Sequence, residues 1–180
     1  SPVNGLWFNI FGGYRISKDE LFCNLVDADG YYFTHFLQDK AKTAYGGAEL
    51  KYGYKDWFDA SLKGTFYSWK TDNENEELYL MTKPKFELNF YAEAKVFEGL
   101  KVYLGYEYVQ RKEYVIEEGN SSRDFGLGNI SNLSVGASYT FLKDLSVFGR
   151  VNNLLNKQYY YEYGYPAEKL NVLAGLSLVF

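Results

Sequence analysis

The sequence predicts an all-β protein, an antiparallel up-and-down sheet of about eight to ten strands. Three observations lead to this fold class. Apolar and polar residues alternate with period two along most of the 180 residues. Aromatic residues, which favour strands, make up 20% of the chain, and there are only three prolines to interrupt them. Short and long connections also alternate, as they do in strands that run up and down in turn.

The alternating segments follow one another along most of the chain. A helix of 3.6 residues per turn would scatter each apolar set around its axis, whereas a strand keeps it on one face. We therefore expect about nine strands, each with one apolar and one polar face, and essentially no helix. The most regular segments are 6–16, 58–66, 86–96, 100–108, 133–141 and 170–180.

The connections differ in length from one end of the predicted sheet to the other. Short turns are expected at Lys18-Asp19, Lys55-Asp56, Glu98-Gly99 and Lys143-Asp144. Longer polar loops are expected at about 27–43, 71–84, 113–130 and 156–169. Transmembrane barrels combine short turns at one rim with long loops at the other. Because the composition does not change along the chain, residues 1–180 are expected to form a single barrel domain or a portion of one.

The alternation defines two faces but leaves open which medium each face meets. In a soluble lipocalin-like carrier the apolar face lines a pocket, and Gly5-Leu6-Trp7 is similar to a lipocalin triplet. In a membrane barrel the apolar face meets lipid instead. Aromatic residues near the strand ends and opposite charges along the polar face favour the membrane. The residues then expected to face lipid are Leu88, Phe90, Leu104, Val135 and Leu176, and those expected in the lumen are Glu87, Asn89, Lys101 and Ser134.

Two stretches of the last 36 residues resemble a known family. The stripe Val172, Ala174, Leu176, Leu178 and Phe180 resembles the C-terminal assembly signal of bacterial outer-membrane barrels. Before it, Asn153-Leu154-Leu155-Asn156-Lys157-Gln158-Tyr159, followed by Tyr165-Pro166, is similar to the penultimate strand and loop of TonB-dependent receptors. That family often has Pro-Gly-Arg before its last strand, where this chain has Pro166-Ala167-Glu168-Lys169.

The resemblance implies the C-terminal portion of an outer-membrane receptor barrel. Such a barrel has about 22 strands around a plug, and this sequence contains no plug domain. The implied function is import of a large nutrient such as a siderophore, cobalamin or a glycan. The implied partners are the lipid bilayer, the barrel-assembly machinery, and TonB only through the plug. A self-standing small outer-membrane barrel with a structural or adhesive role and a soluble carrier remain as alternatives.

The tyrosine-rich segment before the last strand is the predicted ligand contact. Tyr159, Tyr161, Tyr163 and Tyr165 fall in one long loop, and tyrosine combines rigid contact area with a polar tip. The alternative is a belt of aromatic residues at the membrane interface. The acidic loop Asp72–Glu77 and the loop Gly119–Gly128 are expected at the same rim.

No constellation of residues predicts an enzyme, a cofactor or a metal site. His35 has no nucleophile at a fixed spacing, and Cys23 alternates in phase with apolar neighbours. The acidic run 72–77 lacks the spacing and glycine of a calcium loop. A net charge of −4 without a basic cluster predicts no nucleic-acid partner.

Overall fold

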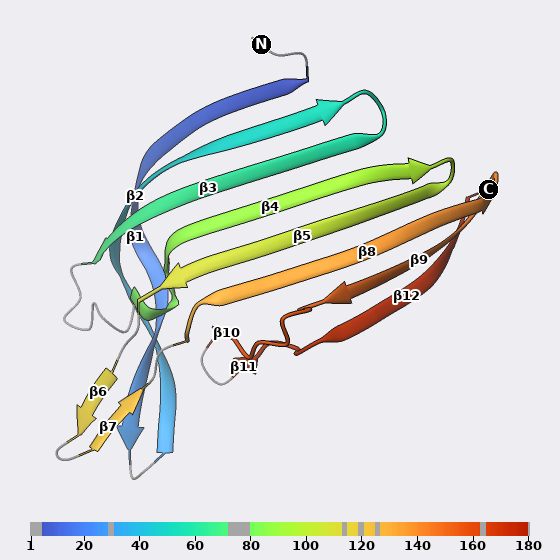
Figure 1. The fold of residues 1–180 in the computed structure, drawn as a ribbon. Helices are drawn as coiled ribbons and strands as arrows, with labels where there is room; N and C mark the ends of the chain where they lie inside the picture. The colour runs from blue at the N-terminus through green and yellow to red at the C-terminus, as the bar shows by residue number, and fades with distance from the viewer. Residues whose placement is uncertain are drawn as a thin grey trace.

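The computed structural model describes the backbone of residues 5–28, 31–71, 80–112, 115–118, 121–124, 127–162 and 165–179, and side chains within 5–18, 40–71, 80–112, 127–161 and 165–179. One sheet dominates these residues (Figure 1). Its strands are β1 (Leu6–Ala28), β2 (Tyr31–Tyr54), β3 (Phe58–Thr71), β4 (Pro84–Phe97), β5 (Leu100–Arg111), β8 (Ile130–Leu142), β9 (Leu145–Asn152) and β12 (Asn171–Leu178).

The strand order confirms the predicted up-and-down topology. The order is β1-β2-β3-β4-β5-β8-β9-β12, and every neighbouring pair is antiparallel. Two small hairpins lie outside the sheet, β6 (Val115–Glu118) with β7 (Ser121–Asp124) and β10 (Tyr160–Glu162) with β11 (Tyr165–Pro166). The sheet is curved, and among the described strands β1 and β12 form its two edges (Figure 1).

The predicted difference between the two ends of the sheet is also confirmed. Three expected turns, at Lys55-Asp56, Glu98-Gly99 and Lys143-Asp144, join neighbouring strands at one end. Figure 1 shows the small hairpins at the opposite end, which we call the long-loop end. Residues 80–82, just before β4, form a helical turn at that end.

The predicted turn at Lys18-Asp19 and the predicted loop 27–43 are wrong. β1 continues through Lys18 to Ala28 and pairs with β2 throughout. The register shifts between Ser17, which pairs with Ala41, and Glu20, which pairs with Asp39. Here β1 advances three residues while β2 advances two, so a β-bulge absorbs one extra residue. Before the bulge the apolar residues have even numbers, and after it they have odd numbers. A turn would change the alternation in the same way, so the sequence alone suggests a turn here.

Glycine and aromatic residues face each other across the strands of the polar side. Four such pairs are directly opposed: Gly13 with Tyr45, Gly47 with Phe11, Gly136 with Tyr103, and Gly175 with Phe148. A Cβ placed on each glycine would lie within 2.8 Å of its partner's ring. The rings therefore lie over the glycines, an arrangement that restores the packing that a glycine in a strand loses.

Replacing Gly136 with Ala should destabilise the sheet by about 1–3 kcal/mol, the usual cost of overpacking. The added Cβ would lie 2.2 Å from the Tyr103 ring and 2.7 Å from the carbonyl oxygen of Gly149, and the backbone cannot yield easily. Gly149→Ala is the matched control, because a Cβ there meets nothing within 4 Å. Urea titration in detergent would show the difference, and equal midpoints for the two variants would contradict this packing.

Candidate ligand-binding surface at the long-loop end

The two faces of the sheet differ in chemistry. One row of paired residues crosses the whole sheet without a charge: Leu6, Tyr52, Ala60, Ala92, Leu104, Val135, Val151 and Val172. On this apolar face Ile10, Phe66 and Leu176 are 73%, 65% and 71% exposed. On the opposite, polar face Thr65 and Ser134 are only 4% and 7% exposed. The polar face is therefore the more enclosed side of the curved sheet, and the apolar face is open.

The register places the two predicted sets of residues on opposite faces. Leu88 and Phe90 share the apolar face with Leu104, Val135 and Leu176. Glu87, Asn89, Lys101 and Ser134 lie on the polar face. This grouping shows that the alternation predicts the sides of the sheet correctly.

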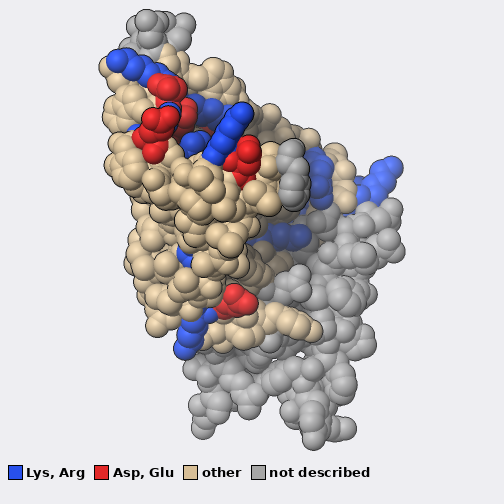
Figure 2. Space-filling model, turned by 90° about the vertical axis from the view of Figure 1, so that its right-hand side faces the viewer, with Lys and Arg blue, Asp and Glu red and all other residues tan. Residues whose placement is uncertain are grey.

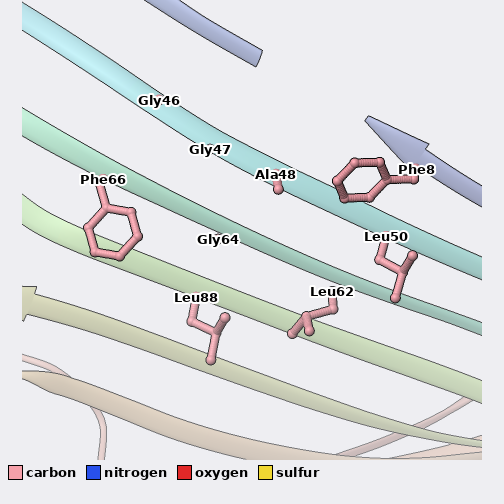
Figure 3. Close-up of a pocket in the computed structure, with 9 residues that line it drawn as sticks. All are labelled: Phe8, Gly46, Gly47, Ala48, Leu50, Leu62, Gly64, Phe66 and Leu88. Carbon is pink, nitrogen blue, oxygen red and sulfur yellow. The ribbon is translucent and has the colours of Figure 1, made fainter. Parts of the chain in front are cut away.

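The apolar face carries a shallow hollow of about 520 Å³ near its β1 edge. Gly46, Ala48 and Gly64 leave space there because they have little or no side chain (Figure 3). The large side chains around this space are Phe8, Leu50, Leu62, Phe66 and Leu88. The side chains that line the hollow are hydrocarbon, so they offer no hydrogen bond to a water-soluble ligand.

The polar face carries charges and side-chain hydrogen bonds, some within one strand and some between strands. The Lys101 ammonium donates to Glu93 Oε1 at 2.9 Å, and the Tyr91 hydroxyl donates to Glu93 Oε2 at 3.0 Å. Glu49 on β2 lies opposite Lys63 on β3 in the strand register, and its Oε1 is 3.0 Å from the Lys51 ammonium. Charged side chains gather toward the top of the view in Figure 2. Such a face suits water or a polar partner.

Asn153 fastens the loop that follows β9. Its side chain is 1% exposed, and its Nδ2 donates to the carbonyl oxygens of Lys157 at 2.8 Å and of Glu168 at 3.1 Å. The Lys157 N–H donates to Asn153 Oδ1 at 3.1 Å, and the Asn153 N–H donates to Asn132 Oδ1 at 3.0 Å. A φ of 48° suits asparagine, one of the few residues that adopt this conformation readily. The Asn153 side chain thus joins both ends of the loop, and the Asn153 backbone N–H binds the loop to β8.

The loop that Asn153 closes carries the predicted tyrosines. Tyr159 is 4% exposed and packs against Val109 and Ile130. Its hydroxyl is near Tyr161, and burial, which is the main cause, raises the pKa of Tyr159 to about 12. Tyr161 and Tyr165 are 50% and 73% exposed. Tyr159 is therefore part of the packed base of the loop, whereas Tyr161 and Tyr165 are exposed and accessible to a ligand.

Strand β5 supports this loop from the side. The buried Arg111 guanidinium donates from Nη1 to the Tyr160 carbonyl oxygen, and the Arg111 N–H donates to Asn129 Oδ1 at 2.9 Å. Tyr159 and Tyr161 contact each other edge to face, with ring centroids 5.6 Å apart. The sequence motif predicts the loop but gives no sign of the role of Arg111, because this contact spans 49 residues.

Several predicted residues lie outside the described side chains. These are Cys23, His35, the acidic run 72–77, Tyr163 and Phe180. The described part of the assembly stripe, Val172, Ala174, Leu176 and Leu178, lies on the apolar face of β12. Within the described residues there is no group of three or more His, Cys, Asp or Glu side chains that could hold a metal ion. No helix among them is long and apolar enough to cross a membrane.

Comparisons with known proteins agree at the level of fold. No protein-family model matches the chain, and no curated protein matches it. Solved structures do match it. The pyoverdine outer-membrane receptor FpvA of Pseudomonas aeruginosa is 15% identical, with a TM-score of 0.70 over 98% of this chain and 27% of the receptor. The ferric-catecholate import receptor Fiu of E. coli is 15% identical, with a TM-score of 0.65 over 97% of this chain and 25% of that one.

The chain has the barrel fold of TonB-dependent outer-membrane receptors. The copper transporter OprC is a third example, 11% identical with a TM-score of 0.69 over 99% of this chain and 29% of OprC. The chain spans about a quarter of the length of these three proteins. The predicted fold class, an antiparallel up-and-down sheet of a β-barrel, is therefore confirmed.

Proposed function

We propose that this chain forms the C-terminal part of the barrel of a TonB-dependent receptor that imports a large, scarce nutrient through the bacterial outer membrane. The observation that supports this most is the fit of nearly the whole chain to about a quarter of three receptors. In this proposal the apolar face contacts lipid, and the polar face lines the lumen. TonB acts only through a plug, and the barrel-assembly machinery recognises the apolar stripe of β12.

The distribution of burial favours this proposal over a soluble carrier. A lipocalin-like carrier encloses its apolar face around a pocket, but here Ile10 and Phe66 are 73% and 65% exposed. A self-standing small barrel has no free edges, because closure pairs its first and last strands. Among the described strands, β1 and β12 have no such mutual pairing. Further strands pairing with these edges would complete a larger barrel.

The proposed ligand contacts lie at the long-loop end. Tyr161 and Tyr165 are exposed on a loop whose base Asn153 and Arg111 fix. Loops fixed by a rigid scaffold commonly carry binding specificity. The proposed ligand is a siderophore, cobalamin or a glycan, and the proposed role includes no catalysis.

Deleting the gene in the source bacterium tests the import function. We expect the deletion strain to lose accumulation of one labelled nutrient among iron from spent medium, cobalamin and oligosaccharides, each supplied at a limiting concentration. A plasmid copy should restore it. Unchanged accumulation of all of them, in a strain whose parent displays the protein in its outer membrane, would contradict import.

The double replacement Tyr161→Ala and Tyr165→Ala should weaken binding of the nutrient identified in that way. Two exposed aromatic contacts support a loss of about five- to thirtyfold in affinity. Tyr54→Ala is the matched control, because Tyr54 is 42% exposed at the end with short turns. Whole-cell binding titrations would measure the effect. Equal affinity of the double variant and the control would assign the tyrosines to an interfacial belt.

A further inference from the structure

The hollow on the apolar face has a floor of small residues and a rim of large ones. Ala48 on β2 lies opposite Gly64 on β3, and Gly46 is the next residue of β2 on the same face. Figure 3 shows the phenyl and leucine side chains that surround this floor. A Cβ placed on Gly46 would meet nothing closer than a backbone oxygen at 3.9 Å. The space above Gly46 is therefore open to an occupant from outside the sheet.

The chemistry of the apolar face changes between the hollow and the long-loop end. Beyond Phe66, the next residues of β3 on this face are Ser68 and then Lys70, and both are exposed. Ser68 lies opposite Ala44, which in turn lies opposite Tyr14, a tyrosine that is 63% exposed. Lys70 forms no ion pair with any side chain that the structure describes. Along one face the order is therefore hydrocarbon, hydroxyl and ammonium.

The separation of Lys70 from the hollow matches the depth of one lipid leaflet. From Lys70 to Phe66 and to Gly64, β3 extends roughly 13 and 20 Å, at about 3.3 Å per residue. In a barrel strand tilted by about 45°, these lengths correspond to depths of roughly 9 and 14 Å. The hydrocarbon of one leaflet is about 15 Å deep, half of the bilayer core. An ammonium at the level of the headgroups thus places the hollow among the acyl chains.

We propose that the hollow holds one acyl chain of a lipid A molecule whose phosphate lies at Lys70. The side chains of the hollow are hydrocarbon, so they favour methylene groups over any polar ligand. Contact with these side chains would order the chain, and a charge-assisted hydrogen bond from the Lys70 ammonium to the phosphate would fix the direction of the lipid. The inference goes beyond import, since it needs only the proposed orientation with the apolar face in lipid.

Titration of hexa-acylated, bis-phosphorylated lipid A into the delipidated full-length protein in detergent, followed by native mass spectrometry, tests the proposal. Gly46→Leu fills the hollow and should bind lipid A about fivefold or more weakly, because methylene groups of the lipid lose their contact with the wall. Gly149→Leu is the matched control. Gly149 lies on the same apolar face outside the hollow, and a Cβ there meets nothing within 4 Å, so this variant should bind as the parent protein does.

Further variants test the headgroup and guard against misfolding. Lys70→Gln should weaken binding by about two- to threefold, because a single exposed ion pair contributes little. Lys143→Gln, at the end with short turns, removes the same charge and should leave the affinity unchanged. Ala48→Leu changes an exposed position in the hollow and should act like Gly46→Leu, even if that variant fails to fold. Dipalmitoyl phosphatidylcholine, which has no net charge, should bind the parent protein more weakly than lipid A does.

Several outcomes would overturn the lipid site. One is equal affinity of Gly46→Leu and Gly149→Leu for lipid A, and another is equal binding of phosphatidylcholine and lipid A by the parent protein. An equal loss in Lys70→Gln and Lys143→Gln would remove the phosphate from Lys70. A parent dimer that disappears in Gly46→Leu would assign the hollow to a second copy of the chain.

The lipid site, the orientation and import can fail separately. If nitroxide labels place Leu88 and Leu104 in lipid while Gly46→Leu binds lipid A as the parent protein does, the orientation stands and the site fails. If the deletion strain keeps its uptake of every nutrient while Gly46→Leu loses affinity as expected, the site stands without import.

Discussion

Replacing Asn153 with Ala is expected to lower the free energy of unfolding by about 3 kcal/mol. The variant leaves the carbonyl oxygens of Lys157 and Glu168 and the N–H of Lys157 without the partner they have in the native loop. These groups surround a side chain that is only 1% exposed, so water cannot easily replace it. Alanine also tolerates the positive φ of this position less well than asparagine does.

Asn89→Ala is the control for this prediction. Asn89 is exposed on the polar face, and the same side-chain truncation there should change the stability by less than about 0.5 kcal/mol. Urea titrations of both variants in detergent, followed by tryptophan fluorescence, measure the difference. If Asn153→Ala is no less stable than Asn89→Ala, the loop closes without the hydrogen bonds of the Asn153 side chain.

Arg in place of Leu104 should cost about 2–4 kcal/mol of stability in a lipid bilayer. Leu104 lies in the middle of the uncharged row that crosses the sheet, opposite Ala92 and Val135. In the proposed orientation, a guanidinium at this place would enter the hydrocarbon core. The penalty should fall when the protein is transferred from bilayers into detergent, where water reaches the surface more easily.

Asn89→Arg provides the matched comparison for Leu104→Arg. Both substitutions introduce the same side chain into a strand, but Asn89 lies on the polar face. We expect little loss at Asn89, and folding titrations in vesicles measure both variants. A larger loss at Asn89 than at Leu104 would place the polar face, not the apolar face, against lipid.

The sequence was sufficient for the sides of the sheet because side-chain alternation is a local property. Each strand carries its own pattern. The register places Leu88 and Leu104 on the same face of the sheet, and Glu87 and Asn89 on the opposite face. The pattern was misleading at Ser17, where one extra residue reverses the phase. A bulge and a turn change the phase in the same way, and the partner strand alone distinguishes them. This ambiguity produced the wrong turn at Lys18-Asp19.

The candidate sites could be predicted only in part, because contacts between distant segments create them. The motif around Asn153 locates a loop, but its closure depends on Glu168 and Asn132. The tyrosine-rich sequence does not reveal that Tyr159 is buried while Tyr165 is exposed. The spacing of residues in the sequence does not show which distant segments come into contact.

In the proposed orientation, the apolar face meets lipid and the polar face meets water. Single nitroxide labels test this orientation in the full-length protein, with Cys23→Ser, in vesicles. The labelled positions are Leu88, Leu104, Asn89 and Lys101. Spin relaxation by oxygen, which concentrates in lipid, and by a water-soluble nickel chelate measures the surroundings of each label. We expect relaxation by oxygen to dominate at Leu88 and Leu104, and relaxation by the nickel chelate to dominate at Asn89 and Lys101. The reverse pattern, or equal nickel access at all four positions, would contradict it.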